Sequence, residues 1–479
     1  MKFIVKLFPE IMVKGTSVKK KMVGQLHENL INQFSRTDTP VELKRYWDKI
    51  EVFCSDELAS EVLGVLTRTP GVEQVLQAEQ SIALTLEEIA EQVAAFALPK
   101  IEGKTFVVRA KRTGSHEFSS FDMEKFIGAY LYRLGNPAGV DLHNPDYKVE
   151  LEYHQNQLNI IVSRHIGLGG FPLGTQGDVL SLMSGGFDST VASYLTIKRG
   201  LKTHYIFFNL GGAAHEMGVK QVALYLWSRY ASSHRVQFIT VPFEAVVAEI
   251  FHSTHESYMG VVLKRLMLMA AERIADEMGI DALVTGESVA QVSSQTLRNL
   301  ALIDEVSTKL VIRPLAVMDK PEIMRIADQI GTRHYAESMP EYCGVISKNP
   351  VTHGSFKSVA REAKKFDYAV LDQAVVDAVS IPVDTIVTDV NQQQNIEVVT
   401  DPQDAVVIDI RQPEEIAKRA LEIENKLVIP FFELNQKFKR LDQDKQYLLY
   451  CDKGVMSQLH AQYLKDQGFD NVKVYRPAD

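Results

Sequence analysis

The sequence predicts a protein of several domains that mixes α/β and α+β folds, with a doubly wound parallel sheet in its middle. Its 479 residues exceed what one hydrophobic core usually supports, so we expect about three or four domains. From residue 178 on, apolar strands alternate with helical segments, which predicts a parallel sheet with right-handed crossovers. A complete glycine loop, Ser184–Ser189, joins the first of these strands to the first helix.

This glycine loop has the residue types that hold phosphate. Gly185 and Gly186 let backbone N–H groups approach phosphate oxygens, and the following helix start adds partial positive charge. The hydroxyl groups of Ser184 and Ser189 add donors. Asp188 would repel a bare phosphate, so we expect it beside a metal ion or a water network. No lysine follows the second glycine in the way a Walker P-loop requires.

Composition and charge narrow the class of protein. The contents of 46% hydrophobic and 24% charged residues are those of ordinary globular domains, and no run of 18 apolar residues predicts a transmembrane helix. The N-terminus alternates like a strand and lacks the apolar core of a signal peptide. Three cysteines make neither a disulfide framework nor a zinc site, so we expect a reducing, cytoplasmic location. The histidines have no metal-ligand spacing. Without a long apolar run, we expect no membrane partner.

The net charge of −9 is unevenly distributed, because residues 1–50 carry 10 basic and 5 acidic side chains. A polyanion could therefore dock at the N-terminus. Three lysines, Lys19, Lys20 and Lys21, open a predicted helix there, either as a solvated helix end or as phosphate contacts. The expected elements are a strand, this helix and two more strands: Lys2–Phe8, Ser17–Phe34, Val41–Tyr46 and Lys49–Cys54.

A second basic cluster follows a predicted strand that starts at Thr105. Arg109 and Lys111 fall on one strand face and Arg112 at the strand end, and aromatic rings come next in the chain. Such a cluster suits phosphate contacts and stacking on RNA. Two further strands are expected to pair through a turn at Gln155 and Asn156.

These segments divide the first part of the chain. Residues 61–165 resemble a THUMP domain, an RNA-binding module that a ferredoxin-like domain precedes in its family, and residues 1–60 would be that ferredoxin-like domain. Residues 166–177 contain five glycines and a proline between residues 167 and 177, which predicts a linker.

Residues 178–375 are predicted to form the domain that holds the nucleotide. Ligands of such sheets bind beyond the carboxyl ends of the strands, where Gly286 and Gln295 are candidate contacts. Lys264 lies near the start of the predicted helix Met259–Met278, where a cation opposes the helix dipole, so either a phosphate partner or a solvated lysine is expected. Lys320, at the start of another helix, could face the same anion.

Residues 376–400 are predicted to be a linker and residues 401–479 a last domain. Its strand Gln446–Tyr450 runs into Cys451, where backbone N–H groups and a helix start would stabilise a thiolate or hold a persulfide. Phosphatase loops carry an arginine at the position of Ser457, so phosphate hydrolysis would lack its anion clamp. This part resembles a rhodanese domain.

The SGGxDS loop resembles that of ATP pyrophosphatases, which adenylate their substrates. Together, the four parts in this order resemble the tRNA 4-thiouridine synthetase family, ThiI, in its long form with a rhodanese extension. The closest matching motifs are Leu182–Ser189, Phe208–Glu216, Met339–Val345 and Cys451–Ser457.

The resemblance implies sulfur insertion at uridine 8 of tRNA, with ATP and Mg²⁺ as cofactors. It also implies that Leu182 and Met183 bind ATP with the glycine loop. Cys451 would accept a persulfide, and Cys343, in a loop bounded by proline and glycine, would resolve it and leave a disulfide. Implied partners are a cysteine desulfurase and a small sulfur-carrier protein of thiamine synthesis, and a homodimer is left open.

Two rival functions remain at this stage. Another adenylating enzyme, such as an amide-forming synthetase, would leave the basic N-terminal segment and Cys451 unexplained. A tRNA-binding sulfur carrier without adenylation would leave the intact SGGxDS loop unexplained.

Overall fold

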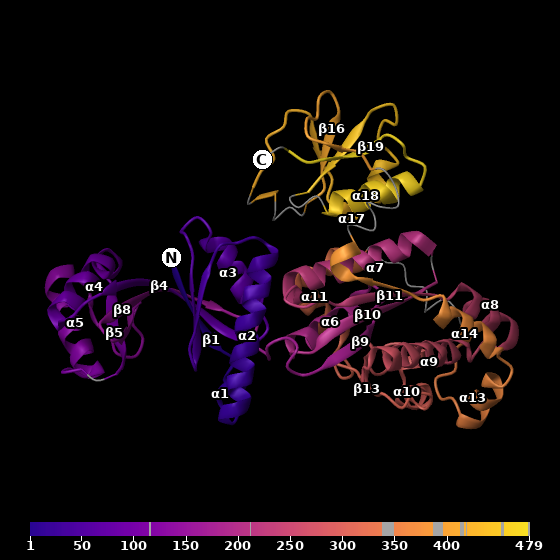
Figure 1. Ribbon diagram of the computed structural model, residues 1–479, viewed down its shortest axis with the longest axis horizontal. Helices are drawn as coiled ribbons and strands as arrows, with labels where there is room; N and C mark the ends of the chain where they lie inside the picture. The colour runs from indigo at the N-terminus through magenta and orange to yellow at the C-terminus, as the bar shows by residue number, and fades with distance from the viewer. Residues whose placement is uncertain are drawn as a thin grey trace. The chain divides into compact units, whose positions relative to one another are not determined.

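The computed structural model describes residues 1–114, 116–210, 212–337, 349–386, 396–411, 416–417, 419–451 and 455–477. The chain divides into two compact units, residues 1–175 with 198–200, and the remainder. Figure 1 labels their elements. None of the described helices is both long and apolar enough to cross a membrane.

The first unit is built on one sheet with the strand order β2-β3-β1-β4-β8-β7-β5-β6. Its strands are β1 (Lys2–Leu7), β2 (Glu42–Arg45), β3 (Lys49–Phe53), β4 (Val72–Ile82), β5 (Thr105–Thr113), β6 (Gly139–Val140), β7 (Tyr147–His154) and β8 (Gln157–Ile166). Its helices are α1 (Pro9–Met12), α2 (Thr16–Arg36), α3 (Ala59–Arg68), α4 (Leu86–Ile101) and α5 (Ser120–Gly135).

Two hydrophobic clusters lie along this sheet. One gathers the apolar face of α2 and includes Val62 and Leu66 of α3, and the other lies between α4, α5 and the strands β5, β7 and β8. The strand β4 contributes Val75 to the first cluster and pairs antiparallel with β8, which contributes to the second. The predicted boundary at residue 60 therefore falls within α3, which packs with the first cluster.

The predicted hairpin of β7 and β8 is confirmed. The two strands pair antiparallel, and Gln155 and Asn156 both have left-handed backbone angles, φ 48° and 67°. A two-residue turn with two positive φ values matches the right-handed twist of the strands, and asparagine at the second position tolerates such an angle.

The second unit holds a six-stranded sheet in the order β13-β12-β9-β10-β11-β14. The strands are β9 (Asp178–Leu182), β10 (Lys202–Asn209), β11 (Gln237–Pro242), β12 (Ala282–Val284), β13 (Leu310–Ile312) and β14 (Val379–Pro382). The helices are α6 (Phe187–Lys198), α7 (Gly212–Leu226), α8 (Glu244–Ser253), α9 (Met259–Met278), α10 (Leu297–Asp304), α11 (Lys320–Ile330), α12 (Arg333–Glu337), α13 (Phe356–Ala363) and α14 (Tyr368–Val376).

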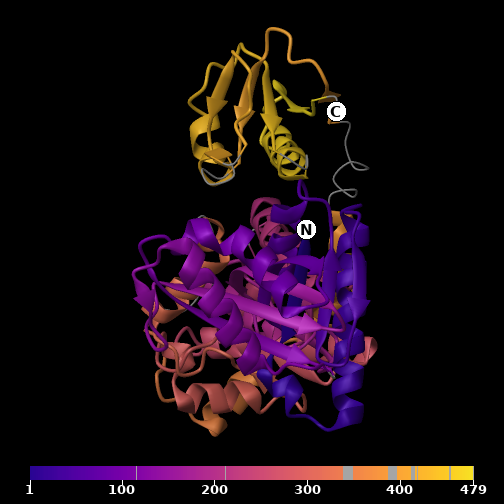
Figure 2. The same ribbon diagram turned by 90° about the vertical axis from the view of Figure 1, so that its left-hand side faces the viewer.

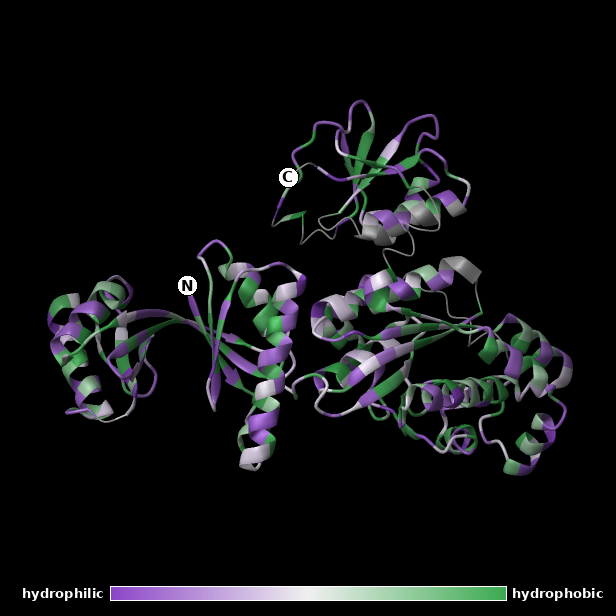
Figure 3. Cartoon of the chain, in the orientation of Figure 1, coloured by the Kyte–Doolittle hydropathy of each residue, from purple (hydrophilic) through white to green (hydrophobic). Residues whose placement is uncertain are grey.

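Helices cover both faces of this sheet. One cluster joins α6 and α11 to one face, and a larger one joins α8, α9, α10 and α14 to the other (Figure 1). Figure 3 shows the strands between these layers as mostly hydrophobic, as buried parallel strands should be. The sheet is not purely parallel, because β14 pairs antiparallel with β11. This edge strand lies in the range predicted to be a linker.

Residues 396–477 contain a smaller parallel sheet in the order β15-β19-β18-β16-β17. The strands are β15 (Val398–Val399), β16 (Val406–Asp409), β17 (Lys426–Val428), β18 (Tyr447–Tyr450) and β19 (Val472–Tyr475). The helices α17 (Phe431–Phe438) and α18 (Val455–Asp466) lie against one face of this sheet (Figures 1 and 2).

Candidate functional site

The glycine loop lies between β9 and α6 at the carboxyl end of the sheet. Gly185 has φ +81°, a backbone angle that side-chain-bearing residues rarely adopt. The backbone N–H of Ser184 donates to Ser189 Oγ at 3.1 Å, and Thr190 N–H donates to the carbonyl oxygen of Gly186 at 3.3 Å. These bonds curl the backbone into a compact turn at the helix start.

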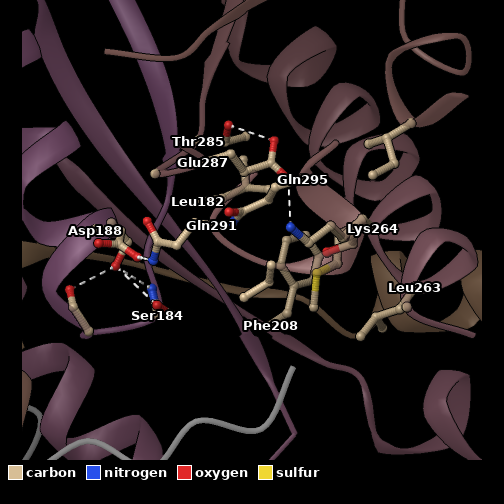
Figure 4. Close-up of a pocket in the computed structure, with 18 of the residues that line it drawn as sticks. Leu182, Ser184, Asp188, Phe208, Leu263, Lys264, Thr285, Glu287, Gln291 and Gln295 are labelled. Carbon is tan, nitrogen blue, oxygen red and sulfur yellow. Dashed lines mark hydrogen bonds and ion pairs between the residues drawn. The ribbon is translucent and has the colours of Figure 1, made fainter. Parts of the chain in front are cut away.

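Asp188 is held by two side chains from distant parts of the chain. Lys320 Nζ lies 2.8 Å from Asp188 Oδ1. Gln291 Nε2 donates to Asp188 Oδ2 at 2.7 Å (Figure 4). Asp319 caps α11 by accepting a hydrogen bond from Glu322 N–H at 2.8 Å, which sets the direction of the helix start that carries Lys320. A carboxylate and an ammonium group therefore lie together beside the loop.

Gly286 lies directly against the backbone of the glycine loop. A Cβ atom at this position would come within 2.5 Å of the carbonyl carbon of Asp188 and of the backbone nitrogen of Ser189. Only glycine permits this approach of the β12 end to the loop. The contact that the structure shows for Gly286 is with the loop backbone, and its contact with a nucleotide stays a prediction.

Lys264 belongs to a partly buried network of four charged groups. Its Nζ lies 2.7 Å from Glu287 Oε1 (Figure 4). Arg313 Nε lies 2.9 Å from Glu287 Oε2. Arg313 also binds Asp304 through both terminal nitrogens, at 2.8 and 2.6 Å. Burial alone would raise the pKa of Glu287, but Lys264 and Arg313 outweigh it and hold the pKa below its ordinary value.

The sequence suggested either a phosphate partner or a solvated Lys264, and neither interpretation included the carboxylate that binds it in the structure. Its carboxylate partner, Glu287, comes from the end of β12, 23 positions away in the chain. The neighbouring Arg265 is paired with Glu305 at 2.9 Å. The unfavourable position of Lys264 and Arg265 near the start of the helix is offset by carboxylates that only the tertiary structure brings close.

A cavity of about 860 Å³ opens over these groups. Residues that line it include Leu182, Met183, Phe208, Leu263, Met267 and Leu268 on its apolar side, and the glycine loop with Lys264, Gly286 and Lys320 on its polar side. The Gln295 side chain is only 8% exposed, and its Oε1 has no hydrogen-bond partner among the described residues. One end of the cavity can therefore take an apolar planar ring and the other an anion.

His215 also lines the cavity, next to the glycine loop. Its Nε2 donates to the carbonyl oxygen of Ser184 at 3.2 Å, and its ring meets Phe207 edge to face. Burial lowers the pKa of His215, and the bond to Ser184 opposes this only in part. The imidazole is thus neutral at pH 7 and supports the loop without adding charge.

Cys451 lies at the end of β18, as predicted, and is 9% exposed. The backbone N–H of Ser457, in the first turn of α18, donates to its Sγ at 3.3 Å, and the Ser457 hydroxyl lies 3.5 Å from Sγ. Asp409 and Arg411 form a buried ion pair at 2.7 Å, and the guanidinium covers the ring of Tyr450, so the pair orders the strand ends around the cysteine.

Cys343 lies outside the described residues. The segment that follows it is described from residue 349, and Pro350 and Val351 line the cavity. Three contributors were missed by sequence reasoning, Glu287, Gln291 and His215. Glu287 and Gln291 lie between Gly286 and Gln295, the two predicted nucleotide contacts. The sequence therefore indicated the segment in which they lie, but it did not indicate their partners.

The predicted basic cluster of the first unit lies in the second half of strand β5. Arg109 and Lys111 are both exposed, and Arg109 donates to the carbonyl oxygen of Leu142 at 2.7 Å, while Arg112 donates to that of Gly114 at 2.9 Å. Of the lysines that open α2, Lys20 and Lys21 are exposed. The third, Lys19, is half-buried and places its Nζ 4.6 Å from the ring centre of Trp47, whose side chain is 70% exposed.

The aromatic rings next to β5 do not point freely outward. The ring of His116 stacks on Phe118 at 5.9 Å and contacts Tyr153 at 4.9 Å. Tyr153 is buried, so these rings pack on the domain core.

Comparisons with known proteins agree with this architecture. A family model described as thiamine biosynthesis protein (ThiI) matches residues 174–368, a THUMP domain matches 83–163 and a rhodanese-like domain matches 392–477. The predicted fold class is thereby confirmed.

The chain is 51% identical over 488 residues to a tRNA sulfurtransferase of Vibrio parahaemolyticus, and 47% identical over 482 residues to one of Escherichia coli, each match covering 100% of both chains. Among solved structures it is similar to a 4-thiouridine synthetase–RNA complex with bound ATP. That match has a TM-score of 0.70 and 25% identity, and covers 80% of this chain and 99% of the other.

Proposed function

Since this chain belongs to the tRNA sulfurtransferase family, we propose that it inserts sulfur at uridine 8 of tRNA, by way of an adenylated uridine and a persulfide on Cys451. The observation that carries the proposal is the pairing of two separate chemistries in one chain. The glycine loop, which we infer to bind phosphate, lines a cavity of about 860 Å³, and a cysteine lies at a helix start in the rhodanese-like part of the chain.

ATP fits the cavity in two respects. The apolar side can cover the adenine ring, and the amide of Gln295 can pair with its polar edge. The backbone of the loop Ser184–Ser189 can hold the β- and γ-phosphates at the start of α6. Lys320 and Lys264 supply positive charge on either side.

Asp188 suits Mg²⁺, which binds through one or two carboxylates and completes its shell with phosphate oxygens and water. Mg²⁺ would neutralise charge on the departing pyrophosphate. Among the described residues no group of three or more metal-ligating side chains occurs, so Asp188 with the phosphates would be the binding set.

Adenylation answers the chemical difficulty of the reaction. The C4 oxygen of uracil is a poor leaving group, and transfer of AMP to it makes it a good one. The loop would hold pyrophosphate while the α-phosphorus–oxygen bond to it breaks and the bond to the uracil oxygen forms.

A persulfide on Cys451 would then supply the sulfur. In one route the terminal sulfur attacks C4 and expels AMP, after which the Cys343 thiolate attacks the Cys451 Sγ and frees the thiouridine. In the other route the Cys343 thiolate attacks the Cys451 Sγ first and releases hydrosulfide, which then attacks C4 and expels AMP. Both routes leave a Cys343–Cys451 disulfide, which an external thiol must reduce.

The persulfide would come from a cysteine desulfurase, and a small sulfur-carrier protein of thiamine synthesis would be a second acceptor. Both follow from the family, together with the match to a thiamine biosynthesis model.

The test is the nucleoside composition of tRNA from cells that lack the protein, joined to a reconstituted assay with ATP, tRNA and a persulfide donor. We expect loss of 4-thiouridine in the cells, and ATP-dependent thiolation with pyrophosphate release in the assay. ATP–pyrophosphate exchange that ignores tRNA would favour another adenylating enzyme. Undiminished thiolation without ATP would favour a sulfur carrier.

A further inference from the structure

The helix α13 carries a row of cations that the reaction scheme does not use. Residues 353–365 contain four basic side chains and one acidic, in a chain whose net charge is −9. Lys357, Arg361 and Lys364 follow one another at intervals of four and three residues, which places them on one face of the helix. All three are exposed.

The opposite face of α13 is fixed to the protein. Val359 is fully buried in the larger cluster, and Glu362 is 1% exposed. Glu362 Oε2 accepts the backbone N–H of His255 at 3.0 Å, just before α9. Glu362 therefore faces inward, where it also pairs with Arg361 at 3.3 Å and with Lys365 at 2.7 Å. The side chains of Lys357, Arg361 and Lys364 remain exposed. Figure 3 shows hydrophilic and hydrophobic positions interleaved along this helix.

The start of α13 is tied to the wall of the cavity by Asn299, which is fully buried. Its Nδ2 donates to the carbonyl oxygens of Ser293 and Val351, both at 2.8 Å, and its Oδ1 accepts from Gly354 N–H at 3.1 Å. Ser293 and Val351 line the cavity. The row of cations thus begins a few residues from the mouth of the proposed reaction pocket.

An exposed aromatic ring stands at the same end of the helix. Phe356 is 42% exposed, and the guanidinium of Arg298 lies 4.7 Å from its ring centre. Arg298 is held there by a hydrogen bond to the carbonyl oxygen of Gly354 at 3.0 Å. A ring beside cations is the combination that single-stranded RNA uses, with a base stacked on the ring and phosphates along the positive charges.

We propose that Phe356, Arg298, Lys357, Arg361 and Lys364, the α13 surface, bind the tRNA strand next to the nucleotide that enters the reaction pocket. This rests on the proposed function, and it adds a second RNA contact, on the adenylation domain, to the basic residues of the first unit. An acidic protein partner would be served by the lysines but would have no need of the ring. The ring therefore favours RNA.

The experiment compares two pairs of variants in the full chain. Lys357→Ala with Lys364→Ala removes two cations of the α13 surface, and Arg235→Ala with Arg325→Ala removes two exposed cations elsewhere in the same unit. We expect the first pair alone to weaken tRNA binding and to reduce the slope of log affinity against log salt by about 1.5, since each phosphate contact contributes roughly 0.7 to 0.9.

The ring is tested by Phe356→Ala against Phe251→Ala, an exposed phenylalanine of α8. We expect Phe356→Ala to weaken tRNA binding about five- to tenfold with little change in the salt slope, because a stacking contact carries no counterion. Phe251→Ala should leave affinity unchanged.

Wild-type thiolation of tRNA is measured in the same series, which separates the two proposals. If the wild-type enzyme makes no 4-thiouridine, the proposed function fails. If it does, and both α13 variants bind tRNA like their controls, the α13 surface is not an RNA contact. Slower persulfide acceptance with unchanged tRNA binding would also overturn the inference and assign the surface to a protein partner.

Discussion

At the scale of single residues, the site works through pairs of charges that the chain brings together from far apart. Asp188 meets Lys320 across 132 positions and Gln291 across 103. Lys264 and Arg313 share Glu287 in the same manner. Each pair offsets the charge of its members before a substrate binds, so removal of one member leaves the charge of the other uncompensated.

Replacing Asp188 with alanine should abolish AMP transfer while Cys451 still accepts a persulfide sulfur, because the two chemistries occupy separate domains. ATP–pyrophosphate exchange in the presence of tRNA should fall at least about a hundredfold, the usual effect of losing one charge-stabilising group. Asp372→Ala, an exposed acid of the same unit, is the matched control. Thiolation by Asp188→Ala at a near-normal rate would remove the loop from the mechanism.

Replacing Glu287 with glutamine leaves Lys264 and Arg313 without their shared carboxylate, and should lower the free energy of unfolding by about 3 kcal/mol. Because the folded pKa of Glu287 lies below its unfolded value, its stabilisation is present above about pH 4.3 and is lost as pH falls through the folded pKa.

The unfolding free energy of the wild type should therefore fall more steeply below about pH 4.3 than that of Glu287→Gln, as measured by denaturant titration at several pH values. Glu322→Gln, on the exposed side of α11, should keep the wild-type slope. Parallel curves for all three proteins would contradict the assignment of this charge network.

At the scale of elements, function depends on where strands end. The carboxyl ends of β9 and β12 meet, and Gly286 allows the end of β12 to touch the glycine loop. In the first unit, the exposed end of β5 carries the cations.

Gly286→Ala should displace the glycine loop, because the new Cβ would lie 2.5 Å from loop backbone atoms. We expect a loss of about 1 to 3 kcal/mol in stability, typical of overpacking, together with a raised KM for ATP. Thermal unfolding and ATP kinetics measure the two effects. Gly15→Ala, where a Cβ meets nothing within 4 Å, should change neither. An unaltered KM in Gly286→Ala would show that the contact does not shape the loop.

Changing Arg109, Lys111 and Arg112 together to alanine should weaken tRNA binding and flatten its salt dependence by roughly one unit of slope for each lost phosphate contact. A salt titration of affinity provides the measurement. The control changes three other exposed cations of the same domain, Lys104, Lys125 and Arg133. Equal slopes for both triple variants would move the RNA surface of this unit, first to Lys19, Lys20 and Lys21.

At the scale of the whole molecule, the proposed reaction joins domains that are separate in the chain. Cys451 lies in the part of the chain that matches a rhodanese-like domain, and Cys343, 108 positions earlier, lies in the part that matches the ThiI family model. We predict that their meeting requires domain motion, on roughly a microsecond-to-millisecond timescale.

The wild-type enzyme, run without reductant, should stop after about one turnover with a Cys343–Cys451 disulfide, since each cycle consumes both thiols. Peptide mapping identifies the linkage. Cys451→Ala should lose both persulfide formation and thiolation, whereas Cys343→Ala should keep the persulfide and lose turnover. Cys54→Ala is the control and should behave as wild type. Several turnovers without reductant, or a disulfide through Cys54, would contradict the scheme.

The sequence by itself determined the local structure of this protein. The helix α9 begins and ends where its apolar periodicity predicted, and the Gln155–Asn156 turn, the glycine loop and the position of Cys451 after a strand were all readable. Each depends on residues close in the chain, because hydrophobic periodicity, glycine angles and turn chemistry act over a few positions.

Only the tertiary structure decided the partners. The antiparallel strand β14, the carboxylate beside Lys264, the amide on Asp188 and the exposed face of α13 all depend on which distant segments pack together. The sequence does not show which residue a charged side chain will pair with. An ion pair requires only that the two groups are close in space, and the local sequence pattern does not determine this. For that reason the sequence could indicate which residues gather around the cavity, such as Asp188, Lys264 and Lys320, while their partners could not be predicted.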